Sequence, residues 1–358
     1  MEILIGTDEA GYGPHLGPLV VAATAWEIVQ GAGSRGLGVR TTSECHGLRD
    51  DGAIQSAIRN PKSATSPVDL YRSLKSVVSR VPSNRKVAIA DSKQLYKPGL
   101  GLRQLERGLH AVLAAMERSF ACWASLVEGV AADPNGHHRE LSWHDGFNCS
   151  LPVDADGDEL VKCGEQLVRG CQKAGVRPLV VRARLVFPAE FNELCEHYGS
   201  KGEALSHLTI GLLREVVAEA RTQHSGLGTQ RPVMAVCDKH GGRNFYTALL
   251  QHHFPEHWVR SVFESRAESR YEWGADEEHI EVVFRTKGEA FLPTALASMT
   301  AKYLRELSMR AFNEFWCARV PNLRPTAGYY GDSSRFRRDV TAMQQELGIE
   351  DRVMWRER

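Results

Sequence analysis

The sequence has no long hydrophobic run, no CxxC pair of cysteines and no net charge. The richest apolar stretch, residues 16–26, is short and contains Gly17 and Pro18, so we expect no transmembrane helix. Glu2 stands where a signal peptide has basic residues, which argues against a secretory leader. The eight cysteines are scattered, as in a cytoplasmic protein that keeps its thiols reduced.

Charge is balanced overall but unevenly distributed along the 358 residues. The composition, 42% apolar and 25% charged, is that of a globular protein, and a neutral total on its own argues against a nucleic-acid partner. However, residues 35–118 hold 15 basic and 7 acidic side chains, whereas 119–165 hold 2 and 9, and 264–281 hold 2 and 7. We therefore expect a basic face that is offset by acidic segments elsewhere.

Strand and helix patterns alternate along most of the chain. Apolar, β-branched runs predict strands at 2–7, 18–29, 86–90, 120–130, 178–187, 232–237, 259–263 and 280–284. Apolar residues at helical spacing predict helices at 69–80, 102–116, 188 onward, 203–220, 244–251 and 289–316. Residues 30–66 resemble a loop, and 131–174 a polar, acidic insertion. This order predicts an α/β sheet with helices on its faces.

Acidic residues follow the predicted strands at several places. Asp8, Glu9, Asp91 and Asp238 stand at strand ends, and Glu289 stands where a strand gives way to a helix. Open α/β sheets place their sites at such ends, and clustered carboxylates repel unless a cation neutralises them. Sites made of oxygen ligands suit Mg²⁺ or Mn²⁺, and two such ions can clamp the attacking and leaving oxygens of a phosphodiester.

Asp8 and Glu9 are neighbours, so a regular strand would point them to opposite faces. They can share a site only if the strand ends there, and Gly11, Gly13 and Pro14 supply an interruption. The alternative, that these acids are separate surface or capping carboxylates, stays open on residue patterns alone.

Six blocks of sequence follow one another along the chain: GTDEAGYGPHLGPLVVAA (6–23), ADSKQL (90–95), FNELCEHYGSKGEALSHLTIGLLREV (191–216), VMAVCDKHGGRNFYTALL (233–250), FRTKGEAFLPTALASMTAKYLREL (284–307) and GYYGDSSRF (328–336). In this order they resemble the motifs of the type 2 ribonucleases H, the HII/HIII family. The resemblance implies an α/β fold of the ribonuclease H type: a mixed β-sheet flanked by helices, with insertions and a helical C-terminal part.

The same resemblance implies a mechanism and a metal site. Asp8, Glu9, Asp238 and Glu289 correspond to the catalytic acids, which bind two divalent ions, Mg²⁺ or Mn²⁺. The implied reaction is endonucleolytic hydrolysis of the RNA strand in an RNA–DNA hybrid duplex, in which water attacks the phosphorus and leaves 3′-hydroxyl and 5′-phosphate ends. We expect a monomer with no membrane association.

Substrate contacts are implied at three places. Ser92 and Lys93 are expected to contact a backbone phosphate, as suits a hydroxyl donor beside a cation. The backbone of Gly11, Tyr12 and Gly13 is expected to approach the ribose 2′-hydroxyl. The third contact lies in the C-terminal segment.

Two regions are expected along the chain. Residues 1–320 are predicted to form the catalytic domain, with insertions at about 30–85 and 129–178. Residues 321–358 form an Arg-rich segment expected to contact substrate, and within it Tyr329 is implied to stack on a deoxyribose near the scissile step.

Departures from the family pattern keep two questions open. Tyr12 stands where type HII has Arg, whereas Glu at position 289 is more like type HIII than type HII. Specificity for one embedded ribonucleotide or for a longer RNA tract is therefore left to experiment. The alternatives to a ribonuclease are a non-catalytic nucleic-acid-binding module with the same fold and a nuclease that acts on DNA junctions.

Other motifs receive structural interpretations. GAGSRG (31–36) suggests a dinucleotide loop, but no helix follows, so we favour a plain loop. DADGDELVKCGE (154–165) nearly matches a calcium loop, but Glu159 replaces the required glycine, which favours a solvated acidic insertion. A set of potential zinc ligands has no standard spacing, which favours polar loop residues: His137, His138, His144 and Cys149.

Two further residues lie near the predicted acids in sequence or by motif. His240, two positions past Asp238, is interpreted as a loop residue, with proton transfer as the alternative. Glu203 and Glu289 lie in two copies of the string KGEA. Only Glu289 follows a predicted strand, so we predict that Glu289 is the fourth acid of the site.

Overall fold

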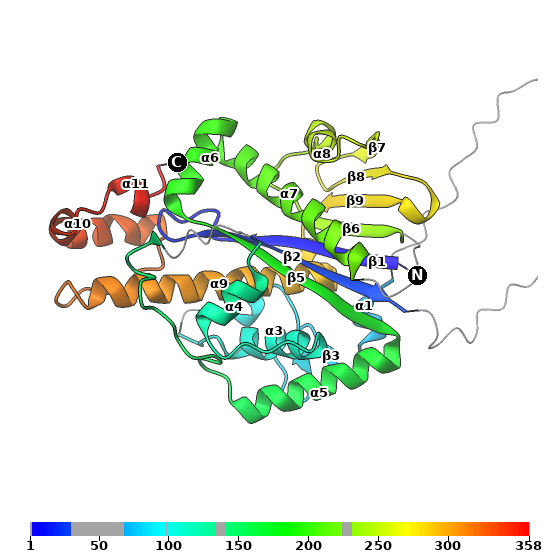
Figure 1. The fold of residues 1–358 in the computed structure, drawn as a ribbon, viewed down its shortest axis with the longest axis horizontal. Helices are drawn as coiled ribbons and strands as arrows, with labels where there is room; N and C mark the ends of the chain where they lie inside the picture. The colour runs from blue at the N-terminus through cyan, green and yellow to red at the C-terminus, as the bar shows by residue number, and fades with distance from the viewer. Residues whose placement is uncertain (1, 30–67, 98, 133–139, 224–230, 358) are drawn as a thin grey trace, which may run out of the picture.

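One seven-stranded mixed β-sheet organises the molecule (Figure 1). The computed structural model describes residues 2–29, 68–97, 99–132, 140–223 and 231–357. The strand order is β5-β2-β1-β6-β9-β8-β7, with bounds Val176–Val186, Leu19–Ile28, Glu2–Ala10, Val233–Asp238, Ile280–Arg285, Glu268–Trp273 and Arg260–Glu264. The GAGSRG motif and most of the first predicted insertion lie outside the described residues.

Parallel and antiparallel pairings divide the sheet. β1 is parallel to β6, and β6 is parallel to β9, so these three neighbours end at the same edge. β2 runs antiparallel to both β1 and β5, and β8 runs antiparallel to β7 and β9. The predicted pair at 2–7 and 18–29 is thus an antiparallel ladder of β1 and β2.

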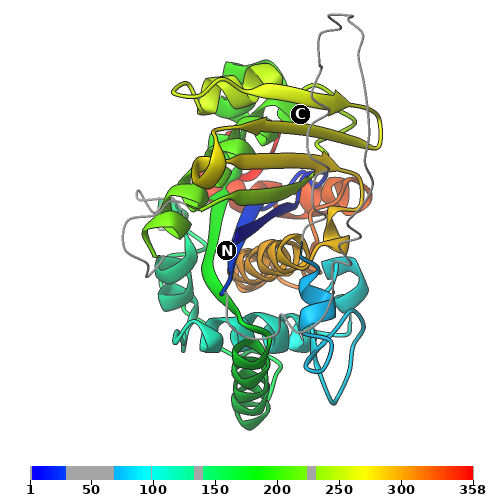
Figure 2. The ribbon, with the colours of Figure 1, turned by 90° about the vertical axis from the view of Figure 1, so that its right-hand side faces the viewer.

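Helices cover both faces of the sheet (Figures 1 and 2). On one face α9 (Leu292–Cys317) packs on β1 and β2, and α3 (Arg103–Ala115) and α5 (Gly157–Ala174) lie beyond it. The other face is covered by α7 (Lys201–Thr222), with α6 (Pro188–Tyr198) and α8 (Thr247–His253) against it. The period-2 pattern of β1 fits this arrangement, because Leu4 joins the α9 core whereas Ile3 and Ile5 join the α7 core.

The remaining elements complete the described chain. They are α1 (Leu70–Ser73), the two-stranded parallel sheet of β3 (Val78–Ser79) and β4 (Val87–Ala88), α2 (Ser92–Leu95), α4 (Trp123–Val130), the 3₁₀ turns η2 (Asp276–Glu278) and η3 (Gly288–Ala290), α10 (Tyr330–Glu346) and α11 (Asp351–Met354). Phe336 of α10 and Met354 of α11 are buried in the same core as α9. The prediction of a mixed sheet flanked by helices, with a helical C-terminal part, is therefore confirmed.

A glycine brings the start of α9 against β1. A Cβ atom on Gly6 would lie 2.0 Å from the backbone nitrogen of Thr294, so only glycine permits this approach. The Thr24 hydroxyl donates to the Pro293 carbonyl over 2.8 Å, and the Thr294 hydroxyl donates to the Val236 carbonyl over 2.9 Å. The first turn of α9 is thereby fixed across β2, β1 and β6.

Several local predictions were wrong. Residues 120–130, predicted as a strand, contain helix α4, because Trp123, Leu126, Val127 and Val130 are the buried residues and they recur at helical spacing. Strand β8 was not predicted, and the helix predicted at 69–80 is the single turn α1 followed by β3. No described helix is both long enough and apolar enough to span a membrane.

The acidic segment at 154–165 contains the start of helix α5, and most of its acids are exposed. Asp156 caps α5 by accepting the Glu159 N–H over 3.1 Å, and Glu159 pairs with Arg103 and Arg107 at 3.0 Å. The buried carboxylate of Glu106 accepts backbone N–H groups at 153–155. Since α5 starts directly after Asp156, its acids cap and pair a helix and do not form a calcium loop.

Candidate active site

Four carboxylates lie at the edge where the parallel strands end. Asp8 and Glu9 are near the end of β1, Asp238 is the last residue of β6, and Glu289 lies in η3, which follows β9. Because β1, β6 and β9 are adjacent and parallel, their carboxyl ends meet, as the sequence pattern predicts.

Asp8 and Glu9 reach one region for a reason that the sequence pattern did not give. The pairing of β1 with β6 stops at Thr7, whereas its pairing with β2 continues to Ala10. Both acids therefore stand beyond the last β1–β6 contact, on backbone that only β2 holds. The Glu9 N–H donates to Asp8 Oδ1 over 2.9 Å, which fixes the Asp8 side chain.

Burial and mutual repulsion disfavour the charged forms of these acids. Burial raises the pKa of Asp8 well above its ordinary value, and the Glu9 carboxylate raises it further. Burial and then the Asp238 carboxylate raise the pKa of Glu9 to about 7. Burial also raises the pKa values of Asp238 and Glu289. The edge therefore holds excess negative charge, which a cation would relieve.

Lys93 supplies positive charge to this edge from α2. Burial lowers the pKa of Lys93, but the carboxylates of Asp91, Asp8, Glu289 and Asp238 outweigh that effect, and the net shift is upward. Asp91 caps α2 by accepting the Lys93 N–H over 3.0 Å. The predicted phosphate-binding residue thus faces the predicted acids.

A serine that the sequence analysis missed joins Ser92 to Asp8. The Oγ of Ser298, buried on α9, lies 3.0 Å from Ser92 Oγ and accepts the Ser92 N–H over 3.3 Å. A hydrogen bond from Ser298 also lowers the pKa of Asp8 against the effect of burial. A polar residue on a buried face of α9, inside the ASMTAK string, was the available signal.

Glu289, and not Glu203, lies with the other acids. Asp238 Oδ1 accepts the Gly288 N–H over 3.2 Å, which ties η3 to the end of β6. Glu203 instead forms an ion pair with Arg243. The choice between the two copies of the string agrees with this placement.

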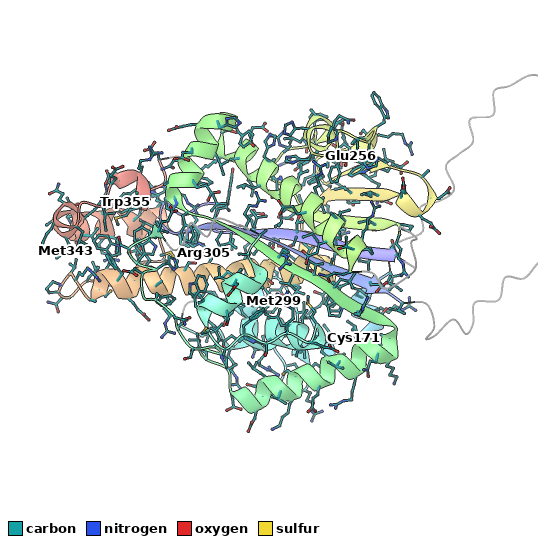
Figure 3. The ribbon with its side chains drawn as sticks, in the orientation of Figure 1. Cys171, Glu256, Met299, Arg305, Met343 and Trp355 are labelled. Atoms are coloured by element: carbon teal, nitrogen blue, oxygen red, sulfur yellow. The ribbon has the colours of Figure 1, made fainter. Side chains whose placement is uncertain are left out.

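Two buried arginines hold the loop at 11–18, and neither was predicted. Arg356 donates to the carbonyls of Gly11, Pro14 and Gly17, the last at 2.7 Å. Arg305 on α9 (Figure 3) donates to Ala327 O over 3.1 Å and lies so close to Gly11 that a Cβ there would be 2.5 Å from its Nε. The glycine at position 11, with φ of 87°, is required on both counts.

Two aromatic residues named in the substrate predictions are Tyr12, which belongs to this loop, and Tyr329. Tyr329 is 51% exposed, and the Arg305 guanidinium lies 5.8 Å from its ring centroid. Tyr12 is half-buried, with Lys201 Nζ 5.6 Å from its ring centroid. Gly13 is exposed beside Tyr12, and a Cβ atom added to it would meet nothing within 4 Å.

His240 is buried and has a structural place. Its Nδ1 lies 3.0 Å from Ser206 Oγ, its ring packs on Phe284 and Tyr246, and burial lowers its pKa to about 3. Next to it Lys239, another residue that was missed, donates to Ser265 O over 2.6 Å and to Asn244 Oδ1 over 3.0 Å. These contacts fix the loop after Asp238.

The zinc set considered from the sequence is only partly within the described residues. His137 and His138 lie outside them. His144 is buried and stacks on Trp123 with ring centroids 5.7 Å apart, as suits a residue of the core.

The oxygen-rich edge fits Mg²⁺ or Mn²⁺ by its chemistry. Its acids are buried or half-buried, have raised pKa values and carry no sulfur or imidazole ligand among them. No three of these acids bring one oxygen each within 4.8 Å of one another. Among the described residues, only a cluster of three histidines has its ligand atoms that close together. A pair of ions about 3.5–4 Å apart spreads its ligands over two centres, so wider spacing is compatible with it.

Solved ribonucleases H resemble this chain in fold. Ribonuclease HII from Archaeoglobus fulgidus, solved in a complex with PCNA, is 16% identical with a TM-score of 0.41 over 99% of this chain and 94% of its own. Ribonuclease H2 from Pyrococcus horikoshii OT3 is 12% identical with a TM-score of 0.37 over 98% and 92%. Bst-RNase HIII in complex with Mn²⁺ is 12% identical with a TM-score of 0.36 over 99% and 66%.

No family model matches the sequence, and no curated protein matches it. The similarities to solved structures are weak by identity and by TM-score. The functional conclusion below therefore rests on the arrangement of carboxylates, Ser92 and Lys93.

Proposed function

We propose that the protein hydrolyses the RNA strand of RNA–DNA hybrids endonucleolytically and leaves 3′-hydroxyl and 5′-phosphate ends. The observation that carries this proposal is the convergence of Asp8, Glu9, Asp238 and Glu289 beside Lys93 at one edge of the sheet. The ordered sequence motifs that resemble type 2 ribonucleases H supply the substrate class.

Asp8, Glu9, Asp238 and Glu289 are the residues that would hold two Mg²⁺ or Mn²⁺ ions. When bound, such ions lower the pKa of the attacking water and stabilise the charge on the leaving oxygen. Lys93 offsets phosphate charge next to these acids.

Ser92 would donate to a phosphate oxygen. Its Oγ lies 3.0 Å from Ser298 Oγ, and its hydroxyl would turn toward the phosphate when the substrate binds. The backbone of the loop at 11–13, which Arg305 and Arg356 contact at Gly11, would approach a ribose 2′-hydroxyl. Tyr329 is exposed enough to stack on a deoxyribose.

Three end-labelled duplexes test the proposal with Mg²⁺ or Mn²⁺ present: a full RNA–DNA hybrid, a DNA duplex with one ribonucleotide, and an all-DNA duplex. We expect cleavage of the hybrid, with 3′-hydroxyl ends. Cleavage at the lone ribonucleotide would add type HII specificity, and its absence would favour type HIII. Cleavage of none would overturn the proposal in favour of a non-catalytic binding module, and cleavage of the all-DNA duplex would favour a DNA nuclease.

A further inference from the structure

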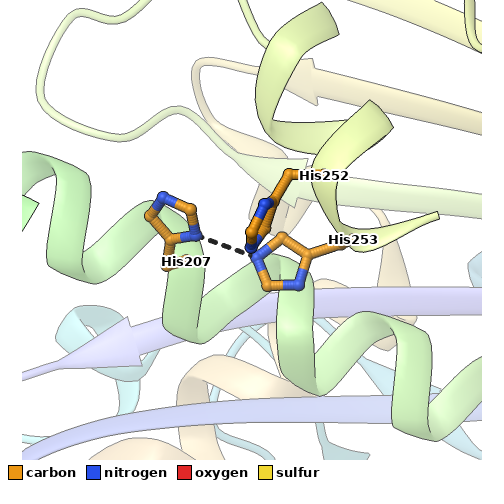
Figure 4. A group of neighbouring side chains, drawn as sticks. All are labelled: His207, His252 and His253. Atoms are coloured by element: carbon orange, nitrogen blue, oxygen red, sulfur yellow. Dashed lines mark hydrogen bonds between the residues drawn. The ribbon is translucent and has the colours of Figure 1, made fainter. Parts of the chain in front are cut away.

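Three histidines from two helices form a cluster (Figure 4). His207 lies in α7, and His252 and His253 are the last residues of α8. One ring nitrogen from each lies within 4.8 Å of the other two, and His207 Nδ1 is 3.1 Å from His253 Nε2. In the part of the chain that the structure describes, no other group of histidine, cysteine or acidic side chains meets this limit.

We propose that His207, His252 and His253 form a binding site for a divalent transition-metal ion of the zinc type. Imidazole nitrogens suit Zn²⁺, Co²⁺, Ni²⁺ and Cu²⁺, whereas Mg²⁺ and Mn²⁺ prefer carboxylate oxygen. None of the four carboxylates belongs to this cluster, and the proposal does not depend on the nuclease activity proposed above.

The geometry is close to what such an ion requires. Tetrahedral coordination with Zn–N distances of about 2.05 Å places two ligand nitrogens roughly 3.3 Å apart, close to the separation found for His207 and His253. Tyr198 stacks on the His207 ring with centroids 4.0 Å apart and 10° between planes, which limits the rotation of this ligand. His252 is exposed, and its ligand nitrogen already lies within 4.8 Å of the other two.

Access from solvent leaves room for a further ligand. His207 and His253 are half-buried and line a cavity of about 520 Å³. Three protein ligands with an open fourth position, filled by water, is a familiar zinc arrangement. The arginines of this cavity are paired with acids, Arg184 with Glu215 and Arg214 with Glu256, so their charge is offset.

The protonation state also favours an ion. Burial, and then the neighbouring His252, lower the pKa of His207, and burial together with His207 and His252 lowers the pKa of His253 to about 4. Both rings are therefore neutral at physiological pH, which is the ligand form. The hydrogen bond between His207 and His253 uses the N–H of one ring. An ion would replace this bond once the donor ring carries its proton on the other ring nitrogen.

An ion here would join α7 to α8 near the loop after Asp238. Ser206, next to His207, contacts His240 of that loop, and α8 follows the same loop in sequence. Because the folded chain brings the three ligands together and the unfolded chain does not, the ion should raise the melting temperature.

Titration with Co²⁺ and with Zn²⁺ tests the site in the full chain. Excess Mg²⁺ is present throughout to occupy the carboxylates, and any metal is first removed by chelator. We expect one Co²⁺ per chain with the visible absorption of a tetrahedral ion, displacement by Zn²⁺, and a rise of several degrees in melting temperature with Zn²⁺.

Variants assign the ligands. Each of the variants His207→Gln, His252→Gln and His253→Gln should bind the ion more weakly than the wild type. Loss of a residue that only hydrogen-bonds to a metal ligand lowers affinity roughly 10- to 100-fold, so we expect at least that loss for a ligand itself. His279→Gln, a change to a histidine outside the cluster, and Asp238→Asn should bind like the wild type. Because His252 is exposed, His252→Gln should leave the fold intact. Weaker binding by this variant would therefore report the loss of a ligand and not misfolding. Absence of binding to the wild type, or wild-type affinity in the three cluster variants, would overturn the proposal.

Discussion

The N–H of Gly288 donates a hydrogen bond of 3.2 Å to Asp238 Oδ1, so the turn that carries Glu289 is attached to the end of β6. A Cβ atom on Gly288 would lie 3.1 Å from Thr294 Cγ2, on the first turn of α9. The position of two acids is thus coupled to one helix start. This coupling explains how residues 51 positions apart in sequence can belong to one site.

Asp238→Asn should abolish cleavage while the fold survives. The amide oxygen can still accept the Gly288 N–H, but it has no charge to hold a divalent ion. Divalent ions stabilise the charge of such a transition state by several kcal/mol, and each 1.4 kcal/mol corresponds to about tenfold in rate. We therefore expect at least about a 100-fold loss of kcat/KM. Hybrid cleavage and urea unfolding measure the two effects. Glu277→Gln, an exposed acid of η2, is the control, and wild-type cleavage by the asparagine variant would exclude the assigned role.

Glu9→Gln should change how stability depends on pH. The pKa of Glu9 in the folded chain is about 7, above the ordinary value of 4.5, so its protonated form favours folding. That contribution is complete below pH 4.5 and is lost as pH rises through about 7 without divalent ions.

Glutamine cannot ionise, so the variant should gain on the order of 2 kcal/mol over the wild type between pH 5 and pH 7.5. Urea unfolding at both pH values measures this difference, and saturating Mg²⁺ should reduce it. Glu165→Gln, on the exposed face of α5, should show no such change. A difference that does not vary with pH would contradict the electrostatic explanation.

Sequence patterns located the acids because their signal is local. Asp8 and Glu9 follow an apolar strand, Asp238 ends another, and Glu289 precedes a helix, so each can be found within a short window. The geometry that brings Asp8 and Glu9 to one region depends on where the β1–β6 ladder stops, and that is a property of the neighbouring strand.

Two of the residues that were missed, Arg356 and Ser298, act over long sequence separations. Arg356 contacts carbonyls about 340 positions earlier, and Ser298 meets Ser92 across 206 positions. The sequence pattern around Arg356 or Ser298 does not indicate a contact with so distant a residue. The strand predicted at 120–130 fails for a similar reason: a short apolar run suits a strand or a buried helix, and packing of Trp123 and Leu126 in the core decides it.

Gly6→Ala should destabilise the protein strongly. The new methyl group would lie 2.0 Å from the Thr294 nitrogen, which is backbone and cannot rotate away. We expect a loss of about 3 kcal/mol or more, at the upper end of overpacking effects, with reduced activity because α9 must shift. Gly331→Ala in α10, where a Cβ meets nothing within 4 Å, is the matched control. Equal unfolding midpoints in urea would show that α9 does not approach β1 this closely.

Arg356→Met should weaken the loop at 11–17. Methionine retains apolar bulk but leaves the carbonyls of Gly11, Pro14 and Gly17 without their donor, at about 1–3 kcal/mol for each buried group that stays unpaired. We expect a lower melting temperature and, if the loop binds the ribose, a larger rise in KM than fall in kcat. Arg352→Met removes only an exposed ion pair with Glu193 and should leave both unchanged.

Lys93→Gln should reduce the salt dependence of hybrid binding. A lysine that contacts a phosphate releases about one counterion on binding, so its loss should lower the slope of log K against log salt by about 1. Lys97→Gln changes an exposed lysine just after α2 and serves as the matched control. Binding is measured in the Asp238→Asn background so that the substrate stays intact. Equal slopes for the two lysine variants would mean that Lys93 balances the acids around it without contacting the substrate.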